Sequence, residues 1–220
     1  MIEVRNLYKS YRDRSQQKRY RVFENLSFTL PEGRNVAILG RNGSGKSTLL
    51  RLLGGIDVPD RGRIITDKRI SWPVGLSGGF QGSLTGRENV KFVARVQGAR
   101  GPALRRIVDY VESFAEIGDY FDEPVKTYSS GMRGRVAFGL SLAFDFDYYL
   151  IDEAMSVGDA HFKKKAKDAL REKIGKANIL LVSHSMSDVA SLCDVALLMD
   201  KGRVGFYNDL KFGMHVYNSM

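Results

Sequence analysis

The clearest chemical signal in this chain is a run of nine residues, GRNGSGKST, which begins at Gly40. The run fits the pattern G-x-x-x-x-G-K-[ST] at every fixed position. Glycines in such a loop let backbone N–H groups close around phosphate oxygens, and the positive end of the following helix points at them. Lys46 is expected to reach the β- and γ-phosphates of a nucleotide, and the Ser47 hydroxyl to hold Mg²⁺. The candidate binding residues are Gly40, Arg41, Asn42, Gly43, Ser44, Gly45, Lys46, Ser47 and Thr48.

The sequence around this loop supplies the elements that must position it. Residues 35–39 are a short apolar run that predicts a buried strand. Residues 47–53 predict a helix, which Gly54 and Gly55 end. The alternative is a glycine-rich turn that matches the pattern by chance. Such a turn need not lie between a strand and a helix, so the flanking elements favour a phosphate site.

A second chemical signal is an apolar strand, predicted over residues 148–151, that ends in two acids. Asp152 would complete a Mg²⁺ shell, and Glu153 would polarise an attacking water. Strands often end in carboxylates without any catalytic role. Here the pair follows a phosphate loop in the same chain, and this order favours the functional interpretation.

Composition limits the class of protein. The chain has 220 residues, 43% hydrophobic and 27% charged, which suits one soluble globular domain. One cysteine, Cys193, rules out an internal disulfide and suits a reducing compartment. We expect neither a membrane span nor a signal peptide. The net charge is +9, and part of it comes from lysines on a predicted helix near residues 161–173. We favour a solvent-exposed face for these lysines over contact with an anionic membrane.

The remaining pattern predicts further elements. Thr85 and Glu88 form a capping box that begins a helix to about Val96, and a second helix begins near Pro102 and ends at Gly118. Residues 63–66 and 69–72 predict two strands of a hairpin, and residues 179–182 another strand. The later alternation of strands and helices predicts a mostly parallel sheet wrapped by helices.

A resemblance to a known family rests on residues 128–135, YSSGMRGR, at the start of a predicted helix. This segment resembles the signature of ATP-binding cassette (ABC) proteins, usually LSGGQ followed by basic residues, although Ser130 replaces the first glycine and Met132 the glutamine. In that family the signature of one subunit closes on the nucleotide of its partner. The resemblance therefore implies that Ser129, Ser130 and Gly131 contact ATP in trans.

Three other segments strengthen the resemblance. Residues 156–159, SVGD, are similar to the D-loop, so Asp159 is implied at the dimer interface. His184 follows a strand as the switch histidine does and is implied to contact the γ-phosphate, although a lone histidine in this place is more often structural. Tyr11 matches the aromatic that stacks on adenine; the alternative is a half-buried strand tyrosine.

One family position has no clear match. A glutamine normally follows the third strand, contacts the γ-phosphate and Mg²⁺, and signals to a membrane partner. Gln81 is the nearby candidate for that role, but Leu76 or Ser77 stands closer to the usual place.

The resemblance implies an α/β fold: a P-loop NTPase of the ABC nucleotide-binding type, with a RecA-like core, an antiparallel β subdomain and an inserted helical subdomain. Residues 1–220 are then expected to form a single ABC ATPase domain, with the helical subdomain at about residues 83–143. ATP and Mg²⁺ are the implied ligands. Hydrolysis would rely on Glu153, His184 and Lys46, and the metal on Ser47, Asp152 and Gln81.

Residues 70–81, 84–89 and 126–132 narrow the resemblance to the ATPases of bacterial capsular polysaccharide exporters. The implied assembly is a nucleotide-sandwich homodimer, peripheral on the cytoplasmic face of the inner membrane. Its implied partners are an integral membrane permease and polysaccharide export assembly proteins, with no nucleic acid. The alternatives are an exporter of O-antigen, teichoic acid or another cargo, a soluble ABC ATPase that acts on DNA or ribosomes, and a scaffold that binds nucleotide without hydrolysis.

Overall fold

The computed structural model describes residues 1–12, 19–76, 78–152, 159–200 and 202–220. Two compact units account for the chain. The strand unit comprises Met1–Pro73, Phe146–Glu153 and Ala177–Met220, and the helical unit comprises Val74–Asp145 and Ala154–Lys176. Both units are assembled from separate stretches of the chain, so each depends on contacts between residues far apart in sequence.

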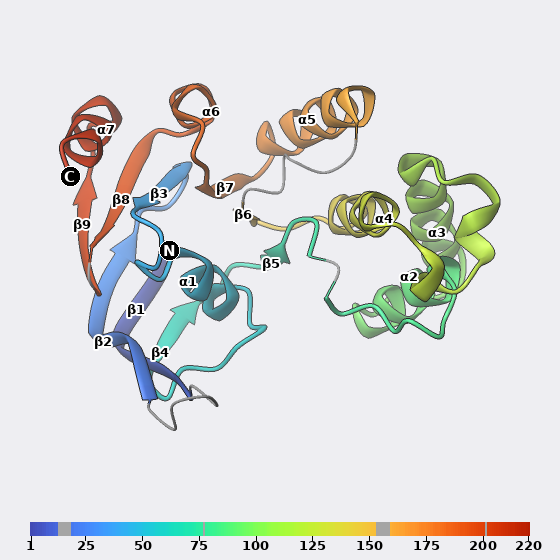
Figure 1. The fold of residues 1–220 in the computed structure, drawn as a ribbon, viewed down its shortest axis with the longest axis horizontal. Helices are drawn as coiled ribbons and strands as arrows, with labels where there is room; N and C mark the ends of the chain where they lie inside the picture. Colours follow the sequence, from blue (N-terminus) through green and yellow to red (C-terminus); the bar gives the residue numbers. More distant parts are fainter. Residues whose placement is uncertain (13–18, 77, 153–158, 201) are drawn as a thin grey trace. The chain divides into compact units, whose positions relative to one another are not determined.

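The strand unit contains a small antiparallel sheet at the N-terminal end of the chain (Figure 1). Strand β1 (Ile2–Arg12) lies between β2 (Arg19–Leu30) and β4 (Arg61–Thr66). Alternate residues of β1, including Ile2 and Val4, are buried, because one face of the sheet packs on the core. This sheet is the predicted antiparallel β subdomain.

The second sheet of the strand unit has six strands in the order β5-β6-β7-β3-β8-β9. All neighbours are parallel except β9, which pairs antiparallel with β8. The prediction of a mostly parallel sheet is therefore confirmed. Its strands are β5 (Ile70–Pro73), β6 (Tyr148–Asp152), β7 (Asn178–Val182), β3 (Val36–Gly40), β8 (Val195–Asp200) and β9 (Arg203–Tyr207).

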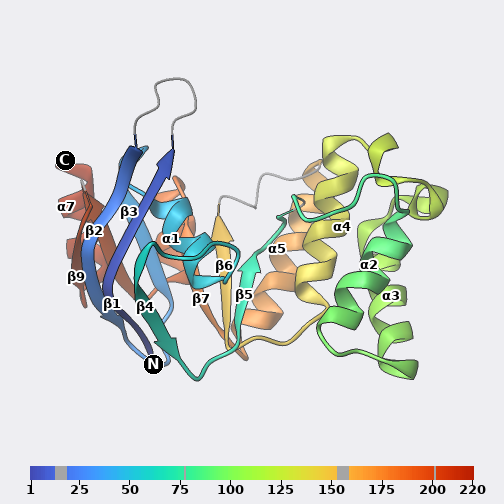
Figure 2. The ribbon, with the colours of Figure 1, turned by 90° about the horizontal axis from the view of Figure 1, so that it is seen from below.

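Helix α1 (Lys46–Leu53) lies between the two sheets of the strand unit (Figure 2). Its leucines, such as Leu49 and Leu50, are fully buried in one cluster that includes residues of both sheets. This burial fixes the helix that follows the phosphate loop. Helices α6 (Met186–Leu192) and α7 (Leu210–Asn218) complete the unit.

The helical unit packs around aromatic side chains. The Phe114 ring stacks on Phe138 with centroids 6.0 Å apart, and it meets the edge of Phe162 at 5.5 Å. These rings join three helices in one core. The unit contains α2 (Gly86–Val96), α3 (Gly101–Ala115), the 3₁₀ turns η1 (Gly118–Asp122) and η2 (Val125–Thr127), α4 (Ser130–Leu142) and α5 (Ala160–Ile174).

The predicted hairpin around Asp67 and Lys68 is wrong. Strand β4 pairs with β1, whereas β5 pairs with β6 in the other sheet. Neither Asp67 nor Lys68 has the positive φ angle that a tight hairpin turn of the I′ or II′ type requires. Arg69 instead donates its N–H to the Asp147 carboxylate at 2.7 Å, which directs β5 to the edge of the parallel sheet.

The structure confirms one predicted helix start and corrects one predicted helix end. Thr85 and Glu88 form the complete capping box of α2. Helix α3 ends at Ala115 and not at the predicted Gly118, because Glu116 adopts a left-handed conformation with φ of 50°. Within the described ranges, no helix combines the length and apolar character needed to cross a membrane.

Candidate nucleotide site

The phosphate loop connects the end of β3 to the first turn of α1. Lys46 is 9% exposed, and its ammonium donates hydrogen bonds to the Gly40 carbonyl at 2.7 Å and the Arg41 carbonyl at 3.1 Å. The ammonium is thus held inside the curve of the loop, where the sequence pattern places phosphate oxygens.

Two glycines of the loop allow a close approach to neighbouring backbone and side chains. A Cβ on Gly45, at φ of 100°, would lie 2.8 Å from Phe23 and 2.9 Å from Val22. A Cβ on Gly40 would lie 2.4 Å from the Met199 carbonyl oxygen. The loop therefore fits against β2 and β8 only because these positions carry no side chain.

Two observations in the loop fit a bound phosphate group. The N-cap of helix α1 is Gly45, which has no side chain to cap the helix, so the first backbone N–H groups keep their hydrogen-bonding capacity for a ligand. The buried Ser44 hydroxyl has no hydrogen-bond partner among the described residues. Amide donors at a helix N-terminus, beside a buried ammonium, are the groups that a phosphate anion requires.

The parallel sheet brings two more predicted residues to the same edge as the loop. Asp152 is the last residue of β6 and lies opposite Val182, the last residue of β7. His184 follows β7, and β7 neighbours β3, which leads into the phosphate loop. Carboxyl ends of parallel strands share one edge, where ligands bind in open α/β sheets. Glu153 lies outside the described residues.

The side chains at this edge offer the type of ligand atom that a magnesium ion requires. Ser47 offers a hydroxyl and Asp152 a carboxylate, which are oxygen ligands that Mg²⁺ prefers. The described part of the chain contains no cluster of three His, Cys, Asp or Glu residues that would form a self-sufficient metal cage.

Tyr11 is a half-buried strand residue with a firmly held hydroxyl. It donates to the Asp57 carboxylate at 2.6 Å, and the Lys9 ammonium bonds the other oxygen of Asp57 at 2.5 Å. The same ammonium lies 4.9 Å from the centre of the Tyr11 ring. Lys9 and Asp57 thus fix the orientation of the aromatic that the sequence predicts beside adenine. Sequence reasoning missed both, although a lysine at an inward position of β1 was a usable signal.

The signature segment begins α4 in the helical unit. The Ser129 hydroxyl caps this helix by accepting the Met132 N–H at 3.1 Å. Ser130 and Gly131 form its first turn. The preceding Tyr128 is buried and accepts the Gly86 N–H at 3.1 Å. Residues 129–131 therefore present a helix N-terminus on an anchored turn, which is a suitable phosphate-binding element.

Asp159, the last residue of the D-loop segment, links two helices of the helical unit. It caps α5 by accepting the Phe162 N–H, and it forms an ion pair with Arg135 of α4 at 2.6 Å. The capping hydrogen bond is the main cause that lowers the pKa of Asp159, and the positive charge of Arg135 lowers it further. The ion pair connects the signature helix to the start of α5. The other residues of the D-loop segment, 156–158, lie outside the described residues.

Gln81 lies in the helical unit, just before α2. Its backbone N–H donates to the Asn89 side chain at 2.8 Å, and Asn89 returns a hydrogen bond to the Gln81 carbonyl at 3.0 Å. The Gln81 side chain is exposed. Asn89 therefore fixes the backbone at this position and leaves the amide side chain available. Leu76, the other described candidate, is 42% exposed.

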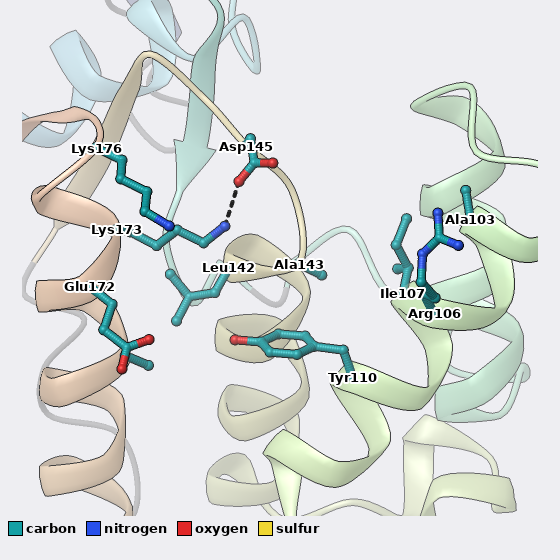
Figure 3. Close-up of a pocket in the computed structure, with 11 residues that line it drawn as sticks. Ala103, Arg106, Ile107, Tyr110, Leu142, Ala143, Asp145, Glu172, Lys173 and Lys176 are labelled. Atoms are coloured by element: carbon teal, nitrogen blue, oxygen red, sulfur yellow. Dashed lines mark hydrogen bonds and ion pairs between the residues drawn. The ribbon is translucent and has the colours of Figure 1, made fainter.

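Another cavity, of about 610 Å³, lies among α3, the end of α4 and α5 (Figure 3). Tyr110 and Leu142 line it together with the ion pair between Lys173 and Asp145, whose atoms are 2.6 Å apart. None of the site residues predicted from the sequence lines this cavity. This cavity is therefore lined by residues other than those of the candidate nucleotide site.

Comparison with known proteins gives a consistent family. Residues 23–156 match the profile of the ABC transporter family. The polysialic acid transport ATP-binding protein KpsT of Escherichia coli is 54% identical over 218 residues, which cover 99% of this chain and 96% of that protein. The ATP-binding protein BexA of Haemophilus influenzae is 45% identical over 99% of this chain and 98% of its own. The capsule polysaccharide export ATP-binding protein CtrD of Neisseria meningitidis serogroup B is 44% identical over the full length of both.

Solved structures agree on the fold. A dimeric ATP-binding cassette in a post-hydrolysis state, bound to ADP and Pi, superposes with a TM-score of 0.75. It is 23% identical and the match covers 96% of this chain and 99% of that one. The expected ABC cassette fold is thereby confirmed. The chain belongs to the ABC transporter family, as an ATP-binding and ATP-hydrolysing subunit.

Proposed function

We propose that this chain is the ATPase subunit of an ABC exporter that moves capsular polysaccharide across the bacterial inner membrane. The observation that supports this cargo best is 54% identity, over nearly the whole chain, to a polysialic acid transport ATP-binding protein. Relatives named for teichoic acid and O-antigen export are 41% and 38% identical over about 85% of the chain, so we rank those cargoes second.

The strand unit supports a direct account of hydrolysis. The loop from Gly40 to Thr48 binds the phosphates of ATP through its N–H groups, and Lys46 neutralises their charge. Ser47 and Asp152 would hold Mg²⁺, with Gln81 of the helical unit as a further candidate ligand. When bound, this ion would neutralise negative charge on the nucleotide phosphates. Glu153 orients the attacking water, and His184 contacts the γ-phosphate.

We infer that the active form contains two copies of the chain. Ser129, Ser130 and Gly131 of one copy would close on ATP held by the loop of the other, and Asp159 would lie at this interface. The first turn of α4 keeps backbone N–H donors that its cap does not use. These donors suit a contact with the γ-phosphate of ATP bound to the other copy. Residues 1–220 then act as one ATPase domain, with a helical subdomain at about residues 83–143.

The same proposal sets the protein's place in the cell. The chain would lie on the cytoplasmic face of the inner membrane, bound to an integral membrane permease and to polysaccharide export assembly proteins. ATP-driven closure and reopening of the two copies would be passed to the permease, with Gln81 near the point of transmission. No nucleic acid takes part.

The proposal is tested by purifying a tagged chain from native membranes in mild detergent and identifying what accompanies it. We expect a permease of the same export system and ATPase activity that vanadate inhibits. Replacement of the genomic copy by a Lys46→Ala variant should remove capsule from the cell surface. Co-purification with ribosomes or DNA and a normal capsule in the variant strain would contradict the proposed function. Loss of O-antigen or teichoic acid instead would reassign the cargo.

A further inference from the structure

A cavity of about 460 Å³ opens beside the phosphate loop within the strand unit. Gly43 and Ser44 of the loop form one wall, and residues 20–24 of β2 form another. Gly202 and Arg203, at the turn into β9, close a third side. This volume lies in the range of small-molecule sites and adjoins the residues that would hold phosphate.

Packing at two glycines brings the walls of this cavity together. Val22 and Phe23 touch Gly45 so closely that no Cβ would fit there, which anchors β2 against the loop. The Gly202 Cα faces the Val22 carbonyl, and a Cβ on Gly202 would lie 3.5 Å from that oxygen. The walls therefore come from elements that pack on one another, and the cavity is a built feature of the strand unit.

Tyr20 is the exposed aromatic of this cavity. The residue is 59% exposed although it carries a large ring on a strand, and it lines the cavity together with Val22 and Ser44. In the antiparallel ladder Tyr20 lies directly opposite Tyr11, so both side chains project from the same face of the sheet. The Tyr11 hydroxyl is occupied by Asp57, and its ring is approached by the Lys9 ammonium.

The charge of the cavity favours an anionic ligand. Arg21 and Arg203 supply positive charge, of which the Glu24 carboxylate, 2.9 Å from Arg21, offsets one, so an excess of positive charge remains. A ligand that fits this cavity places phosphate at the loop and a flat ring against Tyr20 and Val22. A nucleoside triphosphate carries phosphates at one end and such a ring at the other.

We propose that Tyr20 contacts the base or sugar of bound ATP and sets nucleotide affinity together with Tyr11. This inference rests on the proposed ATPase function and adds a residue to its site. Tyr20 holds the nucleoside, not the phosphates, so its effect must depend on the presence of a base. Stacking of a base on an aromatic side chain is worth about 1–3 kcal/mol, or roughly 5- to 150-fold in affinity.

The test compares two probes by calorimetric titration of the full-length protein: ATP and inorganic tripolyphosphate, each with Mg²⁺. Tyr20→Ala is expected to raise the Kd for ATP roughly tenfold and to leave the Kd for tripolyphosphate within about twofold. Tyr20→Phe should bind ATP like the wild type, because the ring is kept. Phe92→Ala is the matched control, since Phe92 is an equally exposed aromatic, 60%, on α2 of the helical unit.

The outcomes separate this inference from the function on which it rests. Wild-type protein that binds neither probe would overturn both. Wild-type protein that binds both probes, with Tyr20→Ala binding ATP equally well, would overturn only the role of Tyr20. Equal weakening of ATP and tripolyphosphate in Tyr20→Ala would also overturn it, because the change would then act through the phosphate loop.

Discussion

The Lys46 ammonium donates a 2.7 Å hydrogen bond to the carbonyl oxygen of Gly40, six residues earlier in the chain. The bond spans the phosphate loop from its last third to its first residue. It places the positive charge of a 9% exposed side chain inside the loop, beside the uncapped start of α1. The proposed function brings the negative charge of ATP to this point, so we propose that the loop and Lys46 form one binding element.

Lys46→Ala should lower ATP turnover at least about 100-fold, since a preorganised charge at the phosphates typically contributes that much. The variant should fold, as judged by circular dichroism. Steady-state release of phosphate measures the effect. Lys164→Ala, which removes an exposed lysine of α5, is the matched control and should keep wild-type turnover. Full activity in Lys46→Ala would contradict the assignment of the loop.

Gly45→Ala should destabilise the protein by about 2–4 kcal/mol. A side chain there combines left-handed backbone strain with overlap on Phe23, which is buried and cannot move aside. Gly43→Ala is the matched control, because Gly43 has φ of 82° but no atom lies within 4 Å of the position that its Cβ would take. It should cost about 1–2 kcal/mol, from strain alone. Urea unfolding of the two variants measures the difference, and equal losses would contradict the packing of the loop against β2.

Asp57→Asn should lower the free energy of unfolding by about 1–3 kcal/mol at pH 7, because it leaves the Lys9 ammonium, 8% exposed, without its carboxylate. Burial raises the pKa of Asp57, but hydrogen bonds from Lys9, Tyr11 and the Val58 N–H outweigh it and set the folded pKa below the ordinary 3.8.

The sign of the pH dependence follows from that shift. A lowered folded pKa contributes stability above the unfolded pKa, and this stability is lost as the pH falls through the folded value. The difference between wild type and Asp57→Asn should therefore be full at pH 6 and shrink below about pH 4. Unfolding curves at several pH values measure it. Asp67→Asn, at an exposed carboxylate, should change stability by less than about 0.5 kcal/mol at any of them. A pH-independent loss in Asp57→Asn would contradict the role of the ionised carboxylate.

The parts of the structure that sequence predicts well are those where one short segment carries both the turn residues and the start of the helix. The loop from Gly40 to Thr48 includes its own turn residues, its lysine and the start of its helix, so the pattern needs no distant partner. The capping box of Thr85 and Glu88 is likewise local, and the structure confirms it.

The parts that sequence reasoning missed depend on distant pairing. Asp57 and Tyr11 are 46 residues apart, so no local pattern predicts the hydrogen bond that holds the tyrosine. The hairpin around Asp67 failed for the same reason: β4 and β5 each find a better partner in a different sheet, through β1 and β6. Strand alternation identifies strands but does not select their neighbours.

The central claim is that ATP bound between two copies of this chain is hydrolysed with the help of Glu153. It is tested most directly by the mass of Glu153→Gln, measured by size-exclusion chromatography with light scattering at saturating ATP and Mg²⁺. The variant should run as a stable dimer that hydrolyses ATP at least about 100-fold more slowly than wild type, whereas a Lys46→Ala, Glu153→Gln double variant should stay monomeric. A Glu153→Gln protein that binds ATP yet remains a monomer, or that hydrolyses it at the wild-type rate, would contradict the account.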